Sequence, residues 1–358
     1  MTSRERVLAA VSRNIPDRVP FDLSWGFAPL FYEKFKEKTN RTDPLDYFGA
    51  DTRLLSIGET QKQADYSKYF QGHADEAKIT YGEWGIGNVG LENSDLHFQH
   101  IISPLQHAQS VNDIVDYPLP DLLADYRTSH FPQMVQDITS RGLAACAPVT
   151  CTLFEIAWQI RGLEEFLMDM FDNPDMTECL LDRLTELRIG LTEKYVSAGA
   201  DILMLGDDVS MQTGMLVSPT QWRKWFKPRM AKIIDAAKAI NPNIPIFYHS
   251  DGNPTDIIDE LIEIGITILN PVQPECVDPA AIKKQYGDRL AFWGTLGVQQ
   301  TLPFGTPDDV RREVKTRIET VGAGGGLFLA PSHMIEPEVP WENLVAMCEA
   351  IEEYGYYR

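Results

Sequence analysis

Three polar residues in two short segments have the types and spacing that metal-dependent chemistry requires. His249 and Asp251 are separated by one residue in His-Ser-Asp-Gly, and His333 follows the apolar run LFLAPS. In extended backbone, residues two apart project to the same side, so the first pair can approach one ion or substrate. With His333 they would give three ligands and leave one position open, as in catalytic zinc sites. We therefore predict that His249, Asp251 and His333 bind a divalent metal, with Zn²⁺ as the leading candidate and other divalent ions also compatible.

The same residues also fit a polar pocket without metal. His249 and His333 could serve as hydrogen-bonding groups, with Asp251 orienting His249 or capping the next helix. The residue types and spacing leave both interpretations open.

Further polar residues stand where apolar segments end. Asp207 and Asp208 end DILMLGDD, and adjacent carboxylates can raise the pKa of one of them and supply a general acid or base. A capping or ion-pairing role fits these two aspartates as well. We predict Asp207, Asp208 and His333 as catalytic residues. The residues predicted to bind substrate are Trp25, Trp158, Asn270 and Gln273.

The elements that must position these residues are short apolar segments alternating with helical ones. The expected strands are 19–25, a weaker one at 54–58, and then 143–149, 201–207, 244–250, 267–272, 290–294 and 327–332. Such alternation is typical of βα units around a parallel sheet. We predict an α/β fold, a (β/α)₈ TIM barrel, with an open doubly wound sheet as the alternative. In a barrel, the carboxyl ends of the strands meet at one mouth, where active sites lie.

Residues 66–105 depart from this rhythm. They combine aromatic and β-branched residues with glycines and lack a helical period, which predicts a small β-hairpin insertion in the barrel. No Pro/Ser-rich linker or repeat divides the chain, so residues 1–358 are expected to form a single domain.

Composition excludes several classes of partner. The 358 residues carry a formal net charge of −20, which disfavours binding to nucleic acid or to anionic membranes. The five cysteines form no C-x-x-C pair, which argues against a disulfide framework or a cysteine zinc cluster. No segment approaches the ~20 apolar residues of a membrane span. We expect a cytoplasmic protein that acts on a small-molecule substrate.

Several motifs together give the chain a family resemblance. They are PDRVPF, YGEWG, GADILMLGDDVSMQTGMLVSP, FYHSDGN and LFLAPSHMIEPEVPWEN. Over nearly its whole length the chain resembles the uroporphyrinogen decarboxylase superfamily. The resemblance implies a (β/α)₈ barrel, commonly homodimeric, with its cleft at the carboxyl ends of the strands.

One branch of that superfamily, the true decarboxylases, works without metal and holds the propionate groups of its substrate with an N-terminal arginine-rich segment. At the matching place this chain reads DLSWGFAPL, residues 22–30, with no arginine. Ile57 stands near the position of that branch's aspartate, and Trp158 near that of its tyrosine. His333 matches a decarboxylase histidine.

The other branch resembles methylcobalamin:coenzyme M methyltransferases, which bind zinc through H-x-C-G and a later cysteine. His249 matches the histidine, while Asp251 and His333 stand where the two cysteines would be. A metal with nitrogen and oxygen ligands would be more Lewis acidic and could activate a hydroxyl, water or another non-thiol acceptor. The chain lacks a D-x-H-x-x-G corrinoid-binding segment, so a corrinoid would come from a separate corrinoid protein or from solution.

The leading hypothesis is a metal-dependent, methyltransferase-like enzyme that moves a methyl group between a corrinoid and a small acceptor. One alternative is a metal-free decarboxylase of uroporphyrinogen or a smaller carboxylic acid. The other is a non-catalytic protein that binds a corrinoid or another small molecule.

Overall fold

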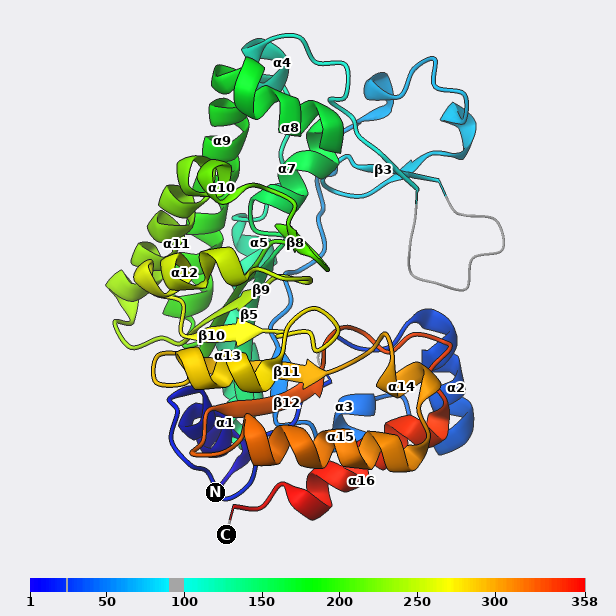
Figure 1. The fold of residues 1–358 in the computed structure, drawn as a ribbon. Helices are drawn as coiled ribbons and strands as arrows, with labels where there is room; N and C mark the ends of the chain where they lie inside the picture. Colours follow the sequence, from blue (N-terminus) through cyan, green and yellow to red (C-terminus); the bar gives the residue numbers. More distant parts are fainter. Residues whose placement is uncertain (24, 90–99, 358) are drawn as a thin grey trace.

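A curved parallel sheet forms the centre of the molecule, with helices on its outer face (Figure 1). The computed structural model describes residues 1–23, 25–89 and 100–357. The strands, in spatial order, are β1 (Thr52–Leu54), β5 (Ala144–Thr150), β6 (Ile202–Gly206), β9 (Ile246–His249), β10 (Ile268–Asn270), β11 (Ala291–Leu296) and β12 (Leu327–Pro331). Every neighbouring pair is parallel. Spatial order equals chain order, which is the βα repetition expected from the sequence.

Both faces of this sheet are buried, which explains why its strands read as continuous apolar runs. In β6, Ile202 and Met204 belong to a cluster inside the barrel, whereas Leu203 and Leu205 pack into the outer core beneath the helices. The inner cluster also includes Val7 from α1 (Ser3–Val11), which packs against several of the strands. Helix α1 thereby fills the end of the barrel opposite the site.

Helices complete the outer layer, with α9 (Pro174–Ser197) beside α11 (Lys227–Ile240) on one flank and α15 (Pro307–Thr320) beside α16 (Trp341–Tyr354) on another (Figure 1). The other described helices are α2 (Pro29–Thr39), α3 (Pro44–Tyr47), α4 (Val111–Val115), α5 (Asp125–Thr128), α6 (Phe131–Ser140), α7 (Phe154–Arg161), α8 (Leu163–Asp172), α10 (Pro219–Trp225), α12 (Ile258–Glu263), α13 (Pro279–Tyr286) and α14 (Thr301–Phe304). Short 3₁₀ turns lie at Ser67–Tyr69, Glu76–Lys78 and Thr255–Ile257. None of the described helices is long and apolar enough to cross a membrane.

The first predicted strand, residues 19–25, is a correction. The described part of this segment forms no regular strand; Phe21 makes an isolated parallel bridge to Leu329 of β12. On its other side, the amide of Asp51, just before β1, donates to the Phe21 carbonyl at 2.9 Å. The segment therefore links the two edge strands of the seven-stranded sheet. Pro20 lacks an N–H group, which limits the ladder that this segment can form.

The expected insertion is met only in part. Strands β2 (Thr80–Tyr81), β3 (Gly87–Val89) and β4 (His100–Ile102) form a small antiparallel sheet, which stands away from the barrel (Figure 1). Residues 90–99 lie outside the described residues, so the hairpin insertion over residues 66–105 as a whole stays a prediction. A second small hairpin, β7 (Ser210–Met211) with β8 (Gly214–Met215), follows β6 and was not predicted.

Candidate metal and substrate site

The site residues are brought together by three adjacent strands at their carboxyl ends. His249 is the last residue of β9, and the sheet register places it beside Gly206 of β6 and Asn270 of β10. A Cβ atom on Gly206 would stand 2.7 Å from the Cβ of His249, so only glycine leaves room for this histidine. Asp208 and Asp251 follow the ends of β6 and β9, which brings both carboxylates to the same edge.

Asp208, His249 and Asp251 form one compact cluster, with ligand atoms all within 4.8 Å of one another. His249 Nε2 lies 3.5 Å from Asp208 Oδ1 and 3.8 Å from Asp251 Oδ1. The Asp251 amide donates to Asp208 Oδ1 at 2.8 Å, which ties the two loops together. Asp251 Oδ1 is buried and has no hydrogen-bond partner. The cluster thus holds an unsatisfied buried acceptor, which is costly unless something binds it.

Asn270 fixes the orientation of the His249 ring. The Asn270 Nδ2 group donates to the Trp293 carbonyl at 2.7 Å, which leaves Oδ1 to face His249 Nδ1 at 2.5 Å. Because that oxygen can only accept, Nδ1 carries a proton, and Nε2 is the nitrogen that faces the two carboxylates, where it can bind either a proton or a metal ion. Metal-binding histidines commonly have their second nitrogen fixed in this way.

These residues fit a divalent cation. Two ligands of one tetrahedral zinc ion lie roughly 3.4 Å apart, close to the separations of Nε2 from the two carboxylates. Burial opposes the charged form of His249, but the Asp251 and Asp208 carboxylates outweigh it and raise the pKa of the imidazole above its ordinary value. The electrostatics of the cluster therefore favour a positive charge, either a proton on His249 or a metal ion between the three residues.

His333 lies in the same region but outside this cluster of described residues. Its ring is parallel to that of Trp25, with centroids 6.5 Å apart, and Trp25 also packs against the His249 ring at 4.9 Å. The sequence-based ligand set had His333 as the third ligand, and this stays a prediction; the compact cluster among the described residues contains Asp208 instead. Trp25, predicted to bind substrate, packs beside both histidine rings.

A cavity of about 670 Å³ opens beside the cluster, and we call it the site cavity. The residues of its lining that matter here are Glu155, Trp158, Asp208, Asp251, Gln273 and His333. The structure thus places predicted residues Trp158, Gln273, Asp208 and His333 around one space. Gln273 also accepts from the Gly252 amide at 3.2 Å, which holds the loop after β9. Asn270 is fully buried behind the cluster and orients His249.

Glu155 was missed by sequence reasoning. It lies in the first turn of α7, directly after β5, and its Oε2 accepts from the Asp208 amide at 3.1 Å. Burial, together with the negative charges of Asp208 and Asp207, raises its pKa to about 8. Its position after a strand end was the available signal, but an acidic residue in a first helical turn is also common for capping reasons.

Asp207 points away from the site cavity. Its carboxylate accepts from the amides of Leu153 and Glu155, at 2.9 and 3.1 Å, at the start of α7. Burial raises its pKa to about 7, although these backbone hydrogen bonds work in the opposite direction. Asp207 therefore positions α7 and Glu155 and does not line the space where a substrate would bind.

Replacing Asp207 by alanine should lower the free energy of unfolding by about 2–4 kcal/mol, because two buried amides lose their acceptor. Asp207→Asn keeps an oxygen in the Oδ1 position and should cost much less. Urea unfolding of the two variants checks this order. If both variants were as stable as the wild type but inactive, Asp207 would instead have the catalytic role predicted from the sequence.

The sequence and the fold of this chain are similar to those of several known proteins. The family model for uroporphyrinogen decarboxylase (URO-D) matches residues 134–354. The methylcobamide:CoM methyltransferase MtaA of Methanosarcina barkeri is 29% identical over 199 residues, covering 56% of this chain and 55% of that protein. The uroporphyrinogen decarboxylase of Hydrogenovibrio crunogenus is 26% identical over 186 residues, which cover 51% of this chain and 50% of that protein. This chain thus aligns with about half the length of these curated relatives.

Among solved structures, a methyltransferase from Methanosarcina mazei covers 99% of this chain and of its own, with a TM-score of 0.68 and 20% identity. At that identity, the likeness shows the fold alone. It extends over the whole barrel, including the strand ends that carry the cluster.

Proposed function

The chain belongs to the uroporphyrinogen decarboxylase family, and from this premise we propose that it is a metal-dependent methyltransferase. In this proposal, Asp208, His249 and Asp251 hold a divalent ion, with Zn²⁺ the leading candidate. The ion serves transfer of a methyl group between a corrinoid, supplied by a separate protein or from solution, and a small molecule in the site cavity. The similarity to MtaA supports the methyl-transfer class.

One observation carries the proposal. His249 Nε2 faces two carboxylates while its Nδ1 is held by Asn270, whose own amide is held by the Trp293 carbonyl. A histidine that only packed or hydrogen-bonded would not need an oriented lone pair beside an unpartnered, buried carboxylate oxygen. The arrangement supports our assignment of His249 as a metal ligand and of Asn270 as the residue that orients it.

Each residue around the site has its own role in this proposal. A divalent ion, when bound, lowers the pKa of a coordinated hydroxyl or water and so favours the nucleophilic form. His333 lines the site cavity from the loop after β12, and we assign it the exchange of a proton with the bound small molecule. Trp158 and Gln273 orient that molecule, while Trp25 keeps the two histidine rings in place.

The decarboxylase alternative finds less support. A porphyrinogen carries several carboxylates, which require cationic partners, but no lysine or arginine is among the described residues that line the site cavity. The non-catalytic alternative gives no reason for an oriented His249. We retain both as outcomes of the experiment.

The experiment measures metal content and methyl transfer on the same purified protein. We expect about one divalent ion per chain by elemental analysis, and loss of the methylcobalamin absorbance with hydroxyl, amine or thiol acceptors. Absence of stoichiometric metal after growth and refolding with Zn²⁺ would reject the metal site. Porphyrin formation from uroporphyrinogen would select the decarboxylase, and tight corrinoid binding without turnover would select the binding protein.

A further inference from the structure

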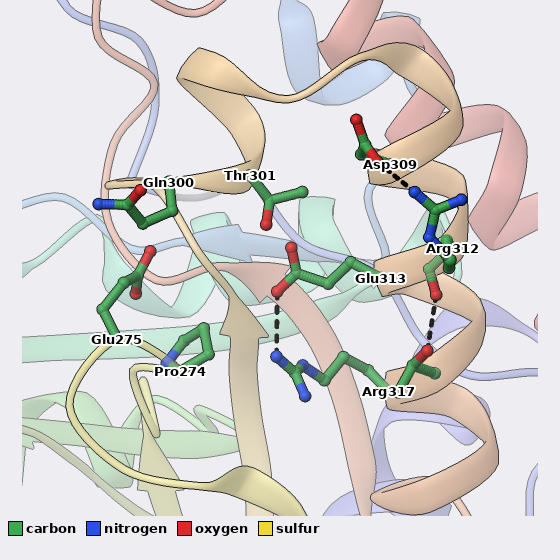
Figure 2. Close-up of a pocket in the computed structure, with 9 residues that line it drawn as sticks. Pro274, Glu275, Gln300, Thr301, Asp309, Arg312, Glu313 and Arg317 are labelled. Carbon is green, nitrogen blue, oxygen red and sulfur yellow. Dashed lines mark hydrogen bonds and ion pairs between the residues drawn. The ribbon is translucent and has the colours of Figure 1, made fainter.

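A second cavity of about 490 Å³ lies against α15, separate from the site cavity (Figure 2), and its size is within the usual range for small-molecule sites. We propose that this second cavity binds a small organic ammonium ion with an uncharged, hydrogen-bonding body, and that this ligand acts as an effector of the metal cluster. The lining comes from the loop after β10, the start of α14 and α15. The residues of the lining that carry the argument are Glu275, Thr301, Asp309, Arg312, Glu313 and Arg317.

Three carboxylates line the second cavity, and two of them have cationic partners on the same helix. Glu313 pairs with Arg317 at 3.1 Å, and Asp309 pairs with Arg312, as Figure 2 shows. The third carboxylate, that of Glu275, has no ion pair with any described residue. The described part of the chain therefore leaves one negative charge in this cavity without a cation.

The carboxylate of Glu275 is held in place but incompletely satisfied. Its Oε1 accepts from the Gln299 amide at 3.0 Å, whereas its Oε2 is buried and has no hydrogen-bond partner. A buried carboxylate oxygen without a donor costs free energy. A water molecule would supply a donor but no charge, whereas an ammonium group supplies both in one charge-assisted hydrogen bond. One monovalent cation therefore matches what Glu275 lacks.

The rest of the lining fits the uncharged part of such a ligand. The side chains of Gln300 and Thr301 line the second cavity and make no hydrogen bond to another described residue. They can bind hydroxyl groups. The guanidinium groups of Arg312 and Arg317 already pair with carboxylates, so an anionic ligand would have to compete with these ion pairs. The inference therefore excludes small anions as ligands of the second cavity.

Two loops line the second cavity on one side and the site cavity on the other. In the loop after β10, Gln273 lines the site cavity and Glu275 lines the second cavity. In the loop after β11, Gln299 lines the site cavity and Gln300 lines the second cavity. The hydrogen bond from the Gln299 amide to Glu275 joins the two loops. A ligand bound to Glu275 therefore acts on a contact that also shapes the site cavity.

A second connection runs through β11 to the metal cluster. Arg317 Nε donates to the Thr295 carbonyl at 3.0 Å, and Thr295 has a φ of 70°, a strained backbone for a β-branched residue. Two residues earlier, the Trp293 carbonyl accepts from Asn270, which orients His249. Because strained backbone depends on its neighbours, a ligand that holds Arg317 also stabilises the part of β11 that supports the metal ligand. This effector role rests on the proposed function, whereas binding in the second cavity does not.

The test compares three probes of similar shape: 2-amino-1,3-propanediol, glycerol and glycerate. Titration of the full-length protein at pH 7, in a buffer free of amines, should give the aminodiol at least about a tenfold affinity advantage over glycerol. Glycerate should bind no better than glycerol. Equal affinities for the aminodiol and glycerol, or a preference for glycerate, would overturn the inference.

Variants locate the binding site. Glu275→Gln removes the charge but keeps an oxygen for the Gln299 amide, so affinity for the aminodiol should fall to that for glycerol. Thr316→Phe, at an exposed position of the lining, should fill the cavity and abolish binding without altering Glu275. Glu319→Gln is the matched control, because Glu319 lies on α15 outside the lining and pairs at 3.9 Å with Lys315. Aminodiol affinity that stayed at the wild-type value in both cavity variants would place the ligand elsewhere and refute the inference.

Zinc titrations test the effector role. Saturating aminodiol should raise the zinc affinity of the wild type at least about threefold and leave that of Glu275→Gln unchanged, and zinc should raise aminodiol affinity by the same factor. Unchanged or lowered zinc affinity rejects the effector role and keeps the ligand site. Aminodiol preference in a protein that binds no zinc keeps the ligand site but rejects the proposed metal site and, with it, the effector role. Zinc binding and methyl exchange without aminodiol preference reject this inference and leave the proposed function intact.

Discussion

Replacing His249 by alanine should remove the bound divalent ion and, with it, methyl transfer. Of the three clustered residues, His249 alone offers a nitrogen ligand, and its Nε2 lies between the two carboxylates. Even outer partners of metal ligands contribute 10–100-fold to affinity, so loss of a ligand should exceed about 100-fold. Elemental analysis after dialysis should show a drop from about one ion per chain to a trace.

Two further variants make this expectation specific. Asn270→Ala keeps all three ligands but frees the ring, and should weaken metal affinity by about 10–100-fold. His333→Ala should leave metal content unchanged and reduce turnover, because His333 lies outside the cluster. The opposite pattern, in which His333→Ala loses the ion and Asp208→Asn keeps it, would restore the ligand set expected from the sequence.

The sequence predicted His333 as the third ligand, whereas the structural cluster contains Asp208. This difference shows which part of the site could not be predicted from the sequence. Chain order alone predicts that His249, Asp208 and His333 meet at one mouth, because parallel strands end on one side. It does not predict which residue of a loop turns inward. In the Asp207-Asp208 pair, the carboxylate of Asp207 accepts hydrogen bonds from backbone amides at the start of α7, whereas the carboxylate of Asp208 faces His249. That division follows from the backbone turn after β6, which the residue types do not encode locally.

Asn270 illustrates a related limit. It was predicted as a residue that binds substrate because it is polar and ends a strand. Its role behind His249 depends on the register of β9 and β10, which pairs Asn270 with His249, and on the Trp293 carbonyl of β11. Cross-strand register depends on the hydrophobic pattern of whole strands. The role of Asn270 can therefore be recognised only once the positions of β9, β10 and β11 in the sheet are known.

The strands themselves follow the same logic. The sheet strands β5, β6, β9, β10, β11 and β12 were predicted because short apolar segments alternate with helical ones along this part of the chain. The start of the barrel was predicted less well. Strand β1 begins at Thr52, before the predicted residues 54–58, and the segment near Phe21 pairs through single bridges. What holds that segment is a polar residue, Asp51, which no apolar pattern reveals.

Asp51 is fully buried and ties three parts of the chain together. Its carboxylate accepts from Arg6 at 2.8 Å, from Arg18 at 3.0 Å and from the Phe21 amide at 2.8 Å. Both arginine side chains are largely buried, with exposed fractions of 10% and 19%. The carboxylate thereby fastens α1 and the Phe21 segment to the start of β1, where the sheet would otherwise have two open edges.

Asp51→Ala should therefore lower the free energy of unfolding by about 3–5 kcal/mol, the cost of removing one partner from a buried ion pair. Arg6 keeps its pairing with Asp17 at 2.7 Å, but Arg18 loses the carboxylate that both of its NH groups contact. Urea unfolding measures the change. Asp125→Ala is the control, because Asp125 is 97% exposed and pairs only across the surface with Lys194, so its unfolding midpoint should match wild type. If the two variants proved equally stable, the Phe21 segment would have to be held by its backbone bridges alone, and the closure of the barrel would not depend on this buried charge.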